Sequence, residues 1–246
     1  MTQRLRLGVN IDHVATIRNA RVVIVACSAE GASLCHRTIC AEAPQRLGPH
    51  AHPELSLHSH SLADYVACLD RGDLDGVAAL MLDSAGKLAR IGADILICPD
   101  NTIHQAMPRV VPRSPRPWLH IADVVADEAL ARGHRRVGVI GTRWLVESAV
   151  YPDALAARGL GCVLPSADDR EAIHRIIMDE LVRGIFHPAS VARLLMALEH
   201  LRATGCEAVV LGCTELPLVV GDANAPLPTL DSTRLLARAA LRRALD

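Results

Sequence analysis

ILICPDNT (residues 95–102) and VVLGCTEL (residues 209–216) are two short stretches built on the same pattern. Each runs from a Val/Ile/Leu-rich segment into a cysteine, Cys98 or Cys213, and then into polar residues that can open a helix. A continuous apolar run of this kind is typical of a strand buried on both faces of a parallel sheet. Because the pattern occurs in both halves of the chain, it predicts two related lobes that face one another.

Apolar runs and helical segments alternate along the rest of the chain. Buried parallel strands are predicted at Val22–Ala26, Ile95–Ile97, Val137–Ile140 and Val209–Leu211. Helical spacing, often ending at a glycine, occurs at Leu74–Arg90, Val124–Arg132, Arg170–Val182 and Ser190–Ala203. The alternation predicts an α/β fold of two similar lobes, each a short parallel sheet flanked by helices, with the active site in the cleft between them.

The proline-rich run PRVVPRSPRP at residues 108–117 indicates where the chain leaves the first lobe, because it is poor in backbone donors and cannot continue a helix. A second crossing is predicted near residues 220–228, followed by a terminal helix at residues 232–245. We expect the following division: residues 1–21 an amino-terminal extension, 22–117 the first lobe with 222–246 returning to it, and 118–221 the second lobe.

Composition excludes several classes of function. A chain of 246 residues that is 50% hydrophobic can bury a large core without disulfides. A net charge of -1 and an aromatic content of 2% argue against a nucleic-acid partner. The 8 cysteines follow no regular disulfide framework and no secretory segment precedes them, so we expect a cytoplasmic protein. No apolar run approaches the roughly 20 residues of a membrane helix, so we expect no membrane partner.

The two cysteines have positions suited to proton transfer. The carboxyl end of a parallel strand is where α/β folds bind ligands, and the amides of a following helix favour a thiolate there. Asn101 and Thr102 follow Cys98, while Thr214 and Glu215 follow Cys213, and these side chains can cap a helix or bind a carboxylate. Two opposed thiols can remove a proton from one face of a carbon atom and return one to the other face, with no metal or cofactor.

Both stretches resemble the two signature segments of the aspartate/glutamate racemase family. The resemblance extends through VIVACSAEGA (residues 23–32), VGVIGTRWLVES (residues 137–148) and IIMDELVRGIF (residues 176–186). It implies a cofactor-independent racemase of an amino acid, aspartate or glutamate, usually a homodimer, that needs neither metal nor pyridoxal phosphate. It also implies that Cys98 and Cys213 are the acid/base pair.

Carried over position by position, the resemblance also implies a set of substrate contacts. These are Asn101, Thr102, Thr142 and Thr214, with Ser28 in the first loop as a further candidate. The position of Glu215 after Cys213 adds it to the predicted substrate contacts. Glu215 could position the nearby thiol, or simply favour the dipole of a following helix. The first loop, ACSAEG, departs from the glycine-rich turn of many relatives. Arg143 and Arg183 could supply a charge for a side-chain carboxylate, although arginines on helix surfaces are usually solvated.

Other functions stay open at this point. One alternative is another enzyme of the superfamily, of the hydantoin racemase, maleate isomerase or arylmalonate decarboxylase type, although two cysteines argue against the single-thiol decarboxylase. The other is a non-catalytic protein that binds an amino acid or dicarboxylate. The remaining cysteines are interpreted as small buried apolar residues: Cys27, Cys35, Cys40, Cys68, Cys162 and Cys206.

Two further motifs lie outside this scheme. The histidines His50, His52, His58 and His60 form two H-x-H pairs that could in principle bind zinc, but we favour a short strand at Glu54–Ser59 with His58 or His60 lining the cleft. Residues 4–21, RLRLGVNIDHVATIRNAR, resemble the amino-terminal signature of pyridoxine 5'-phosphate synthase, with Asn10, Asp12 and His13 at matching positions. The rest of the chain does not continue that resemblance, and a (β/α)₈ barrel would need about 250 residues of its own.

Overall fold

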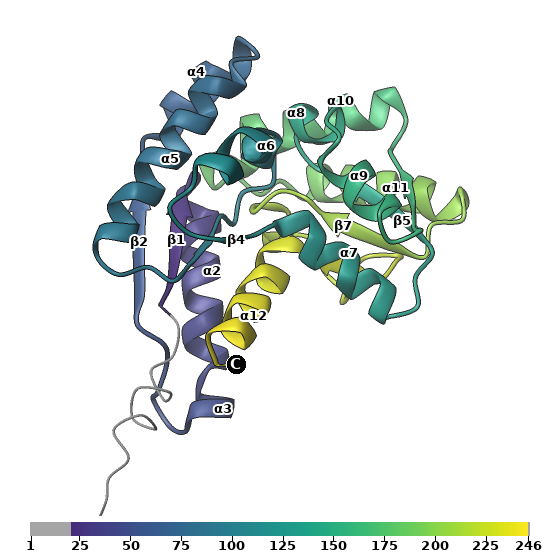
Figure 1. Ribbon diagram of the computed structural model, residues 1–246. Helices are drawn as coiled ribbons and strands as arrows, with labels where there is room; N and C mark the ends of the chain where they lie inside the picture. Colours follow the sequence, from purple (N-terminus) through teal and green to yellow (C-terminus); the bar gives the residue numbers. More distant parts are fainter. Residues whose placement is uncertain (1–20, 246) are drawn as a thin grey trace, which may run out of the picture.

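The computed structural model describes residues 21–245, and these form two sheets, each with helices on both faces (Figure 1). The first sheet has the strand order β2-β1-β3-β4 and the second the order β6-β5-β7-β8. Every pairing within them is parallel. The strands are β1 Val22–Ala26, β2 Leu55–Ser59, β3 Ile95–Ile97, β4 Trp118–Leu119, β5 Arg136–Ile140, β6 Gly161–Val163, β7 Ala208–Leu211 and β8 Thr229–Asp231. The predicted α/β fold with two flanked parallel sheets is confirmed.

Helices follow most of the strands. They are α2 Ala29–Glu42, α3 Pro44–Leu47, α4 Leu62–Asp70, α5 Leu74–Arg90, α6 Met107–Val110, α7 Ile121–Ala131, α8 Arg143–Val146, α9 Val150–Ala156, α10 Ala167–Arg175, α11 Pro188–Ala203 and α12 Ser232–Leu245. Short 3₁₀ turns occur at Thr102–Ala106, Val111–Arg113, Leu181–Arg183 and Leu216–Leu218, and a π-helical segment at Ile176–Glu180. Among the described residues, no helix is long and apolar enough to cross a membrane.

The period-two geometry of the strands separates the core into layers on the two faces of each sheet. In β1, Val22 and Ile24 pack with α2 and α12, whereas Val23 and Val25 pack with α5. In β7, alternate residues pack with α7 and α9 on one face and with α11 on the other. Because both faces are covered, the strands are apolar throughout, as the sequence pattern indicated.

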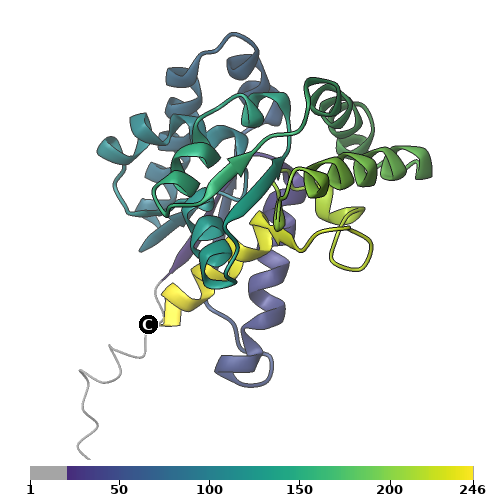
Figure 2. The same cartoon turned by 90° about the vertical axis from the view of Figure 1, so that its right-hand side faces the viewer.

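The last helix, α12, joins the helices of the two sheets. It packs against α2 beside the first sheet and against α7 beside the second, as the turned view shows (Figure 2). Its Arg238 guanidinium holds both carboxylate oxygens of Glu42 in α2, with Nε–O distances of 3.0 Å. At its start, the Ser232 hydroxyl donates to the carbonyl oxygen of Leu211 at 2.8 Å. This helix therefore links α2 of the first sheet to α7 and the end of β7 in the second.

The structure differs from the predicted boundaries at two strands. Trp118–Leu119 pairs with β3, so the first sheet continues past residue 117. Thr229–Asp231 pairs with β7, so this part of the segment 222–246 belongs to the second sheet, and only then does the chain return to α2. These strands have only two or three residues, which is too short for an apolar run to reveal them.

Two predicted segments have a different local structure. Residues 108–117 do contain helical turns, because Pro108 and Pro112 occupy first-turn positions where no amide donor is needed. The predicted helix at 170–182 ends at Arg175 and continues as the π-helical segment Ile176–Glu180, a widened turn that often occurs at functional sites.

Candidate functional site

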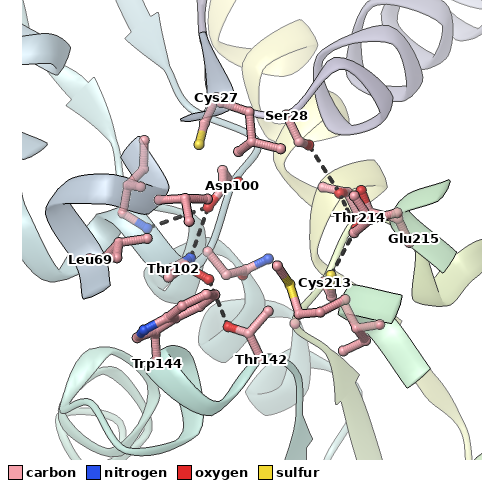
Figure 3. Close-up of a pocket in the computed structure, with 18 residues that line it drawn as sticks. Cys27, Ser28, Leu69, Asp100, Thr102, Thr142, Trp144, Cys213, Thr214 and Glu215 are labelled. Carbon is pink, nitrogen blue, oxygen red and sulfur yellow. Dashed lines mark hydrogen bonds between the residues drawn. The ribbon is translucent and has the colours of Figure 1, made fainter. Parts of the chain in front are cut away.

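A pocket lies between the two sheets, where residues that follow β1 and β3 meet residues that follow β5 and β7 (Figure 3). It is lined by Cys27, Ser28, Leu62, Val66, Leu69, Asp100, Asn101, Thr102, Ile103, Thr142, Trp144, Ile177, Met178, Val182, Gly212, Cys213, Thr214 and Glu215. The predicted site residues found here are Ser28, Asn101, Thr102, Thr142, Cys213, Thr214 and Glu215. The structure therefore brings together every predicted site residue except Cys98.

A chain of hydrogen bonds crosses the side of the pocket that follows β7. The Cys213 thiol donates to Oε2 of Glu215 at 2.8 Å, and the Thr214 hydroxyl donates to the same oxygen at 2.7 Å. Because the Thr214 proton is used in this way, Ser28 donates to the Thr214 oxygen, at 3.2 Å. The Glu215 carboxylate is thus held by a thiol and a hydroxyl, and the chain ends on a serine that follows β1.

Asp100 and Cys27 form the facing side of the pocket. Oδ1 of Asp100 accepts the amide N–H groups of Thr102 at 3.0 Å and Ile103 at 3.4 Å, so the carboxylate caps the 3₁₀ turn that starts there. The Cys27 thiol interacts with the same carboxylate. In Figure 3, Cys27 and Asp100 lie on one side, with Cys213, Thr214 and Glu215 on the other. Asp100 and Cys27 were not predicted as site residues.

Cys98 lies behind this wall. Its side chain is fully buried, packs in the apolar cluster that contains Tyr65 and Met81, and does not line the pocket. Its thiol points to the carbonyl oxygen of Asp100, at 4.0 Å. Burial and the Asp100 carboxylate raise the pKa of the Cys98 thiol well above its ordinary value. The predicted pairing of Cys98 with Cys213 therefore does not fit the geometry.

The position of each cysteine relative to the end of its strand explains why Cys213 lines the pocket and Cys98 does not. Strand β7 ends at Leu211, and Cys213 follows two residues later at the pocket. Strand β3 ends at Ile97, so Cys98 comes at once and is still inside the sheet layer. The chain reaches the pocket at Asp100, three residues after Ile97. Aligning the triplet DNT (residues 100–102) with CTE (residues 213–215) places Asp100 opposite Cys213 and would have identified it. Aligning the two cysteines with each other could not.

Asn101 joins parts of the structure that are distant in sequence. Its Nδ2 donates to Ser232 at 2.9 Å, and its Oδ1 accepts the Tyr151 hydroxyl at 2.6 Å. Both polar ends of this amide are occupied, and the residue is only 2% exposed. Asn101 therefore holds the loop after β3 against α9 and α12, although it also borders the pocket.

Two threonines bridge the floor of the pocket. The Thr102 and Thr142 hydroxyls are 3.0 Å apart, and Thr142 also accepts the amide of Leu145 as the cap of α8. Each hydroxyl has one proton, and the pair uses only one of them between its members. One proton of Thr102 and Thr142 is therefore free for a bound ligand.

The charged and titratable groups of the two sides influence each other. Burial raises the pKa of the Cys213 thiol well above its ordinary value, and Glu215 and, more weakly, Asp100 add to this. Burial also raises the pKa of the Asp100 carboxyl, against the effect of the neighbouring Cys27 thiol and with a further contribution from Glu215. Burial and Asp100 raise the pKa of Cys27 in the same way. The pocket thus contains two carboxyl groups, those of Asp100 and Glu215, and two thiols, those of Cys27 and Cys213. The raised pKa values keep both thiols protonated.

His104, a residue that sequence reasoning missed, fixes the loop that carries Asp100. Its Nδ1–H donates to the carbonyl oxygen of Asp100 at 2.7 Å, and its Nε2 accepts the amide of Ile121 at 3.3 Å. Burial lowers the pKa of His104 to about 3, so the ring is neutral and keeps one tautomer. His104 does not line the pocket, but it ties the end of β3 to the start of α7.

The remaining walls are apolar. On one side they come from Leu62, Val66 and Leu69 of α4, at helical spacing, and on the other from Ile177 and Met178 of the π-helical segment. No lysine, arginine or histidine lines the pocket within residues 21–245.

The two arginines considered from the sequence do not supply a positive charge to the pocket. Arg143 and Arg183 are exposed, and neither lines the pocket. The side chain next to Arg143, Trp144, does line it and stacks edge-on against His174 with ring centroids 5.3 Å apart.

Neither His58 of β2 nor His60, which follows that strand, lines this pocket. His58, His60 and Asp83 bring possible metal-ligating atoms within 4.8 Å of one another, but neither histidine lines the pocket as predicted. The Lys87 ammonium also binds Asp83, and His58 donates to or accepts from Ser84 at 2.9 Å. A lysine at the only carboxylate of this cluster opposes a bound cation.

Comparisons with known proteins agree with the fold. A family model described as Asp/Glu/Hydantoin racemase matches residues 17–240, and the chain belongs to this family. This is a family of cofactor-independent amino-acid racemases, which are isomerases. The comparisons give no support to the resemblance between residues 4–21 and pyridoxine 5'-phosphate synthase, and residues 1–20 lie outside the described part of the structure.

Individual relatives differ in the substrates that their names state. Broad specificity amino-acid racemase RacX of Bacillus subtilis is 24% identical over 166 residues, which cover 68% of this chain and 71% of RacX. Glutamate racemase of Thermus thermophilus is 32% identical over 171 residues, which cover 66% of this chain and 59% of that protein. The crystal structure of a candidate Asp/Glu racemase from Yersinia pestis superposes with a TM-score of 0.85 at 29% identity and covers 92% of this chain and 100% of its own.

Proposed function

We propose that this protein inverts the α-carbon of an amino acid by proton transfer between Asp100 and Cys213. The observation that carries the proposal is that these two groups line one pocket, Asp100 after a strand of the first sheet and Cys213 after a strand of the second. Inversion needs one group that removes a proton from one face and another that returns a proton to the opposite face. Asp100 takes the acid/base role that the family resemblance of the sequence had implied for Cys98.

The resting protonation states define the order of events. Because the pKa of Cys213 is raised, its thiol holds a proton near neutral pH. Burial raises the pKa of Asp100 too, but a carboxyl group starts from a far lower ordinary pKa than a thiol, so Asp100 is the base of the pair. The Asp100 carboxylate takes the α-proton of one enantiomer, and the electron pair of the broken C–H bond stays on carbon. The Cys213 S–H then forms the new C–H bond on the other face and leaves a thiolate.

The opposite enantiomer uses the same groups in reverse. The Cys213 thiolate removes the α-proton, and the protonated Asp100 carboxyl returns one to carbon. Protons are conserved over each passage, and no oxidant or reductant is required. An asymmetric carboxylate–thiol pair therefore meets the same chemical need as the thiol pair predicted from the sequence.

The polar groups around the pair can hold the rest of the amino acid. The free proton of the Thr102–Thr142 pair and the amides at the start of α2 can bind the α-carboxylate. The acids Asp100 and Glu215 favour the α-ammonium group. These donors would also stabilise the negative charge that moves onto the carboxylate in the transition state.

The proposal is tested by α-proton exchange in heavy water. Each enantiomer of a panel of amino acids is incubated with the protein, and deuterium incorporation is followed by NMR together with optical rotation. We expect exchange and loss of optical rotation with at least one amino acid, and a fall of at least about 100-fold in Cys213→Ser. Binding without exchange for every amino acid would instead indicate a non-catalytic binding protein.

A further inference from the structure

We infer that the substrate has an uncharged, apolar side chain rather than the carboxylate of aspartate or glutamate. This inference rests on the proposed racemase function and names its substrate class. It depends on how charge and apolar surface are distributed around the pocket, which divides into a polar end and an apolar end.

The polar end already contains two acids. Asp100 and Glu215 are the only charged side chains that line the pocket within residues 21–245, and both are acidic. Each raises the pKa of groups around it, and Glu215 is only 3% exposed. A substrate α-ammonium group would offset part of this negative charge, whereas a second carboxylate on the substrate would add to it.

Among residues 21–245, the pocket lining offers no cationic side chain for such a carboxylate. Burying an ion without a partner is costly, and a site that binds one normally supplies an arginine, a lysine or several directed donors. The free hydroxyl proton of the Thr102–Thr142 pair and the amides at the start of α2 belong to its polar end, where the α-carboxylate would use them. At the apolar end of the pocket, the described residues offer apolar atoms and not hydrogen-bond donors.

Two apolar walls form that other end. Leu62, Val66 and Leu69 present one face of α4, and Met178 and Val182 approach from the π-helical segment and the turn after it. Val182 is 37% exposed, so the apolar surface continues to the mouth of the pocket. An aliphatic, thioether or aromatic side chain would bury apolar surface against these walls and leave no polar group without a partner.

The test compares amino acids of similar length that differ in charge. Deuterium exchange at the α-carbon is measured for methionine, leucine and phenylalanine against glutamine, glutamate and aspartate. We expect kcat/KM for methionine to exceed that for glutamate by at least about tenfold, which corresponds to roughly 1.4 kcal/mol. A preference for glutamate or aspartate would overturn the inference and leave the racemase function intact. Absence of exchange with every amino acid would remove the proposed function, and the inference with it.

A variant that adds a cation tests the same end of the pocket by a change in the protein in place of a change in the substrate. Val182→Arg places a guanidinium at the partly exposed edge of the apolar end, and we expect the ratio of kcat/KM for glutamate to that for methionine to rise about tenfold. Val111→Arg is the matched control, since Val111 is 54% exposed and outside the pocket, and the ratio should not change. An unchanged ratio in folded Val182→Arg would contradict the assignment of this end of the pocket to the side chain.

Discussion

The Cys213 thiol donates a 2.8 Å hydrogen bond to Oε2 of Glu215, within a pocket that both residues line. The carboxylate is two residues away in sequence, yet it opposes ionisation of the thiol that the proposed chemistry uses. Burial and Glu215 together raise the pKa of Cys213, so Glu215 keeps this group in its proton-donating form.

Replacement of Glu215 by glutamine should lower the pKa of Cys213, because it removes a neighbouring negative charge. The rate of alkylation of Cys213 by iodoacetamide, followed for its own peptide by mass spectrometry, should increase several-fold at pH 8, since only the thiolate reacts. Glu171→Gln is the control, because Glu171 is exposed in α10 and does not line the pocket. Equal rates in wild type and Glu215→Gln would show that the carboxylate does not control the thiol.

The pH dependence of turnover should be bell-shaped for the enantiomer that Asp100 deprotonates. Activity should rise as pH increases through the pKa of Asp100, which burial raises, and fall as pH passes the raised pKa of Cys213. In Glu215→Gln the alkaline limb should move to lower pH while the acid limb changes less. Initial rates of racemisation across pH measure both limbs, and an alkaline limb unaffected by Glu215→Gln would exclude Cys213 as the proton donor.

Much of the fold could be predicted because its signals are local. The apolar strands Val22–Ala26 and Ile95–Ile97 and the amphipathic helix Leu74–Arg90 have the bounds expected from their patterns. The strands β4 and β8 could not be seen, because they contain two or three residues and depend on pairing with β3 and β7.

The site was predictable from the sequence only in part. The hydroxyl and acidic residues after Cys213 follow directly from the motif, but the depth of a side chain depends on where the strand ends. Cys98 comes one residue after β3 and is covered, whereas Asp100 reaches the pocket. Cys27, which was interpreted as a core residue, is indeed buried but also borders the pocket next to Asp100.

Close packing of the loops around the pocket should make Gly31 intolerant of substitution. A Cβ atom there would collide with Cγ2 of Thr214 and lie 2.7 Å from the carbonyl oxygen of Pro99. Gly31→Ala should lower the free energy of unfolding by about 1–3 kcal/mol and reduce activity, because both loops must shift.

Gly86→Ala is the matched control for this change. Gly86 lies within α5, and its Cβ would meet nothing closer than 3.9 Å, so alanine should stabilise the helix by about 0.5–1 kcal/mol. Urea denaturation of both variants provides the comparison. A Gly31→Ala protein as stable and active as wild type would contradict the packing described for these loops.

A buried ion pair outside the pocket lining should make the stability of the fold sensitive to acid. Asp169 is 2% exposed and binds Arg193 at 2.6 Å and His200 at 2.9 Å. Burial acts to raise the pKa of Asp169, but the contacts of its carboxylate with His200 and Arg193 prevail and lower it. Since the pKa of Asp169 is lower in the folded state than in the unfolded state, the ionised carboxylate stabilises the fold at pH values above the unfolded pKa. This stabilisation is lost as the pH falls through the folded pKa.

Asp169→Asn should therefore lower the free energy of unfolding by about 2 kcal/mol at pH 7, with a smaller difference from wild type in acid. Urea unfolding at pH 7 and at pH 3 measures both values. A difference that stays constant over this range would show that the charge of Asp169 does not stabilise α10 against α11.

The most direct test of the account compares Asp100→Asn with Cys98→Ala in the heavy-water exchange assay. Asp100→Asn removes the proposed base and should reduce racemisation at least about 100-fold, while circular dichroism shows a folded protein. Cys98→Ala removes a buried thiol behind the pocket and should retain activity within about threefold in the folded fraction, although its thermal stability should fall. The opposite result, with Cys98→Ala inactive and Asp100→Asn active, would return the acid/base role to Cys98 and contradict the pairing of Asp100 with Cys213.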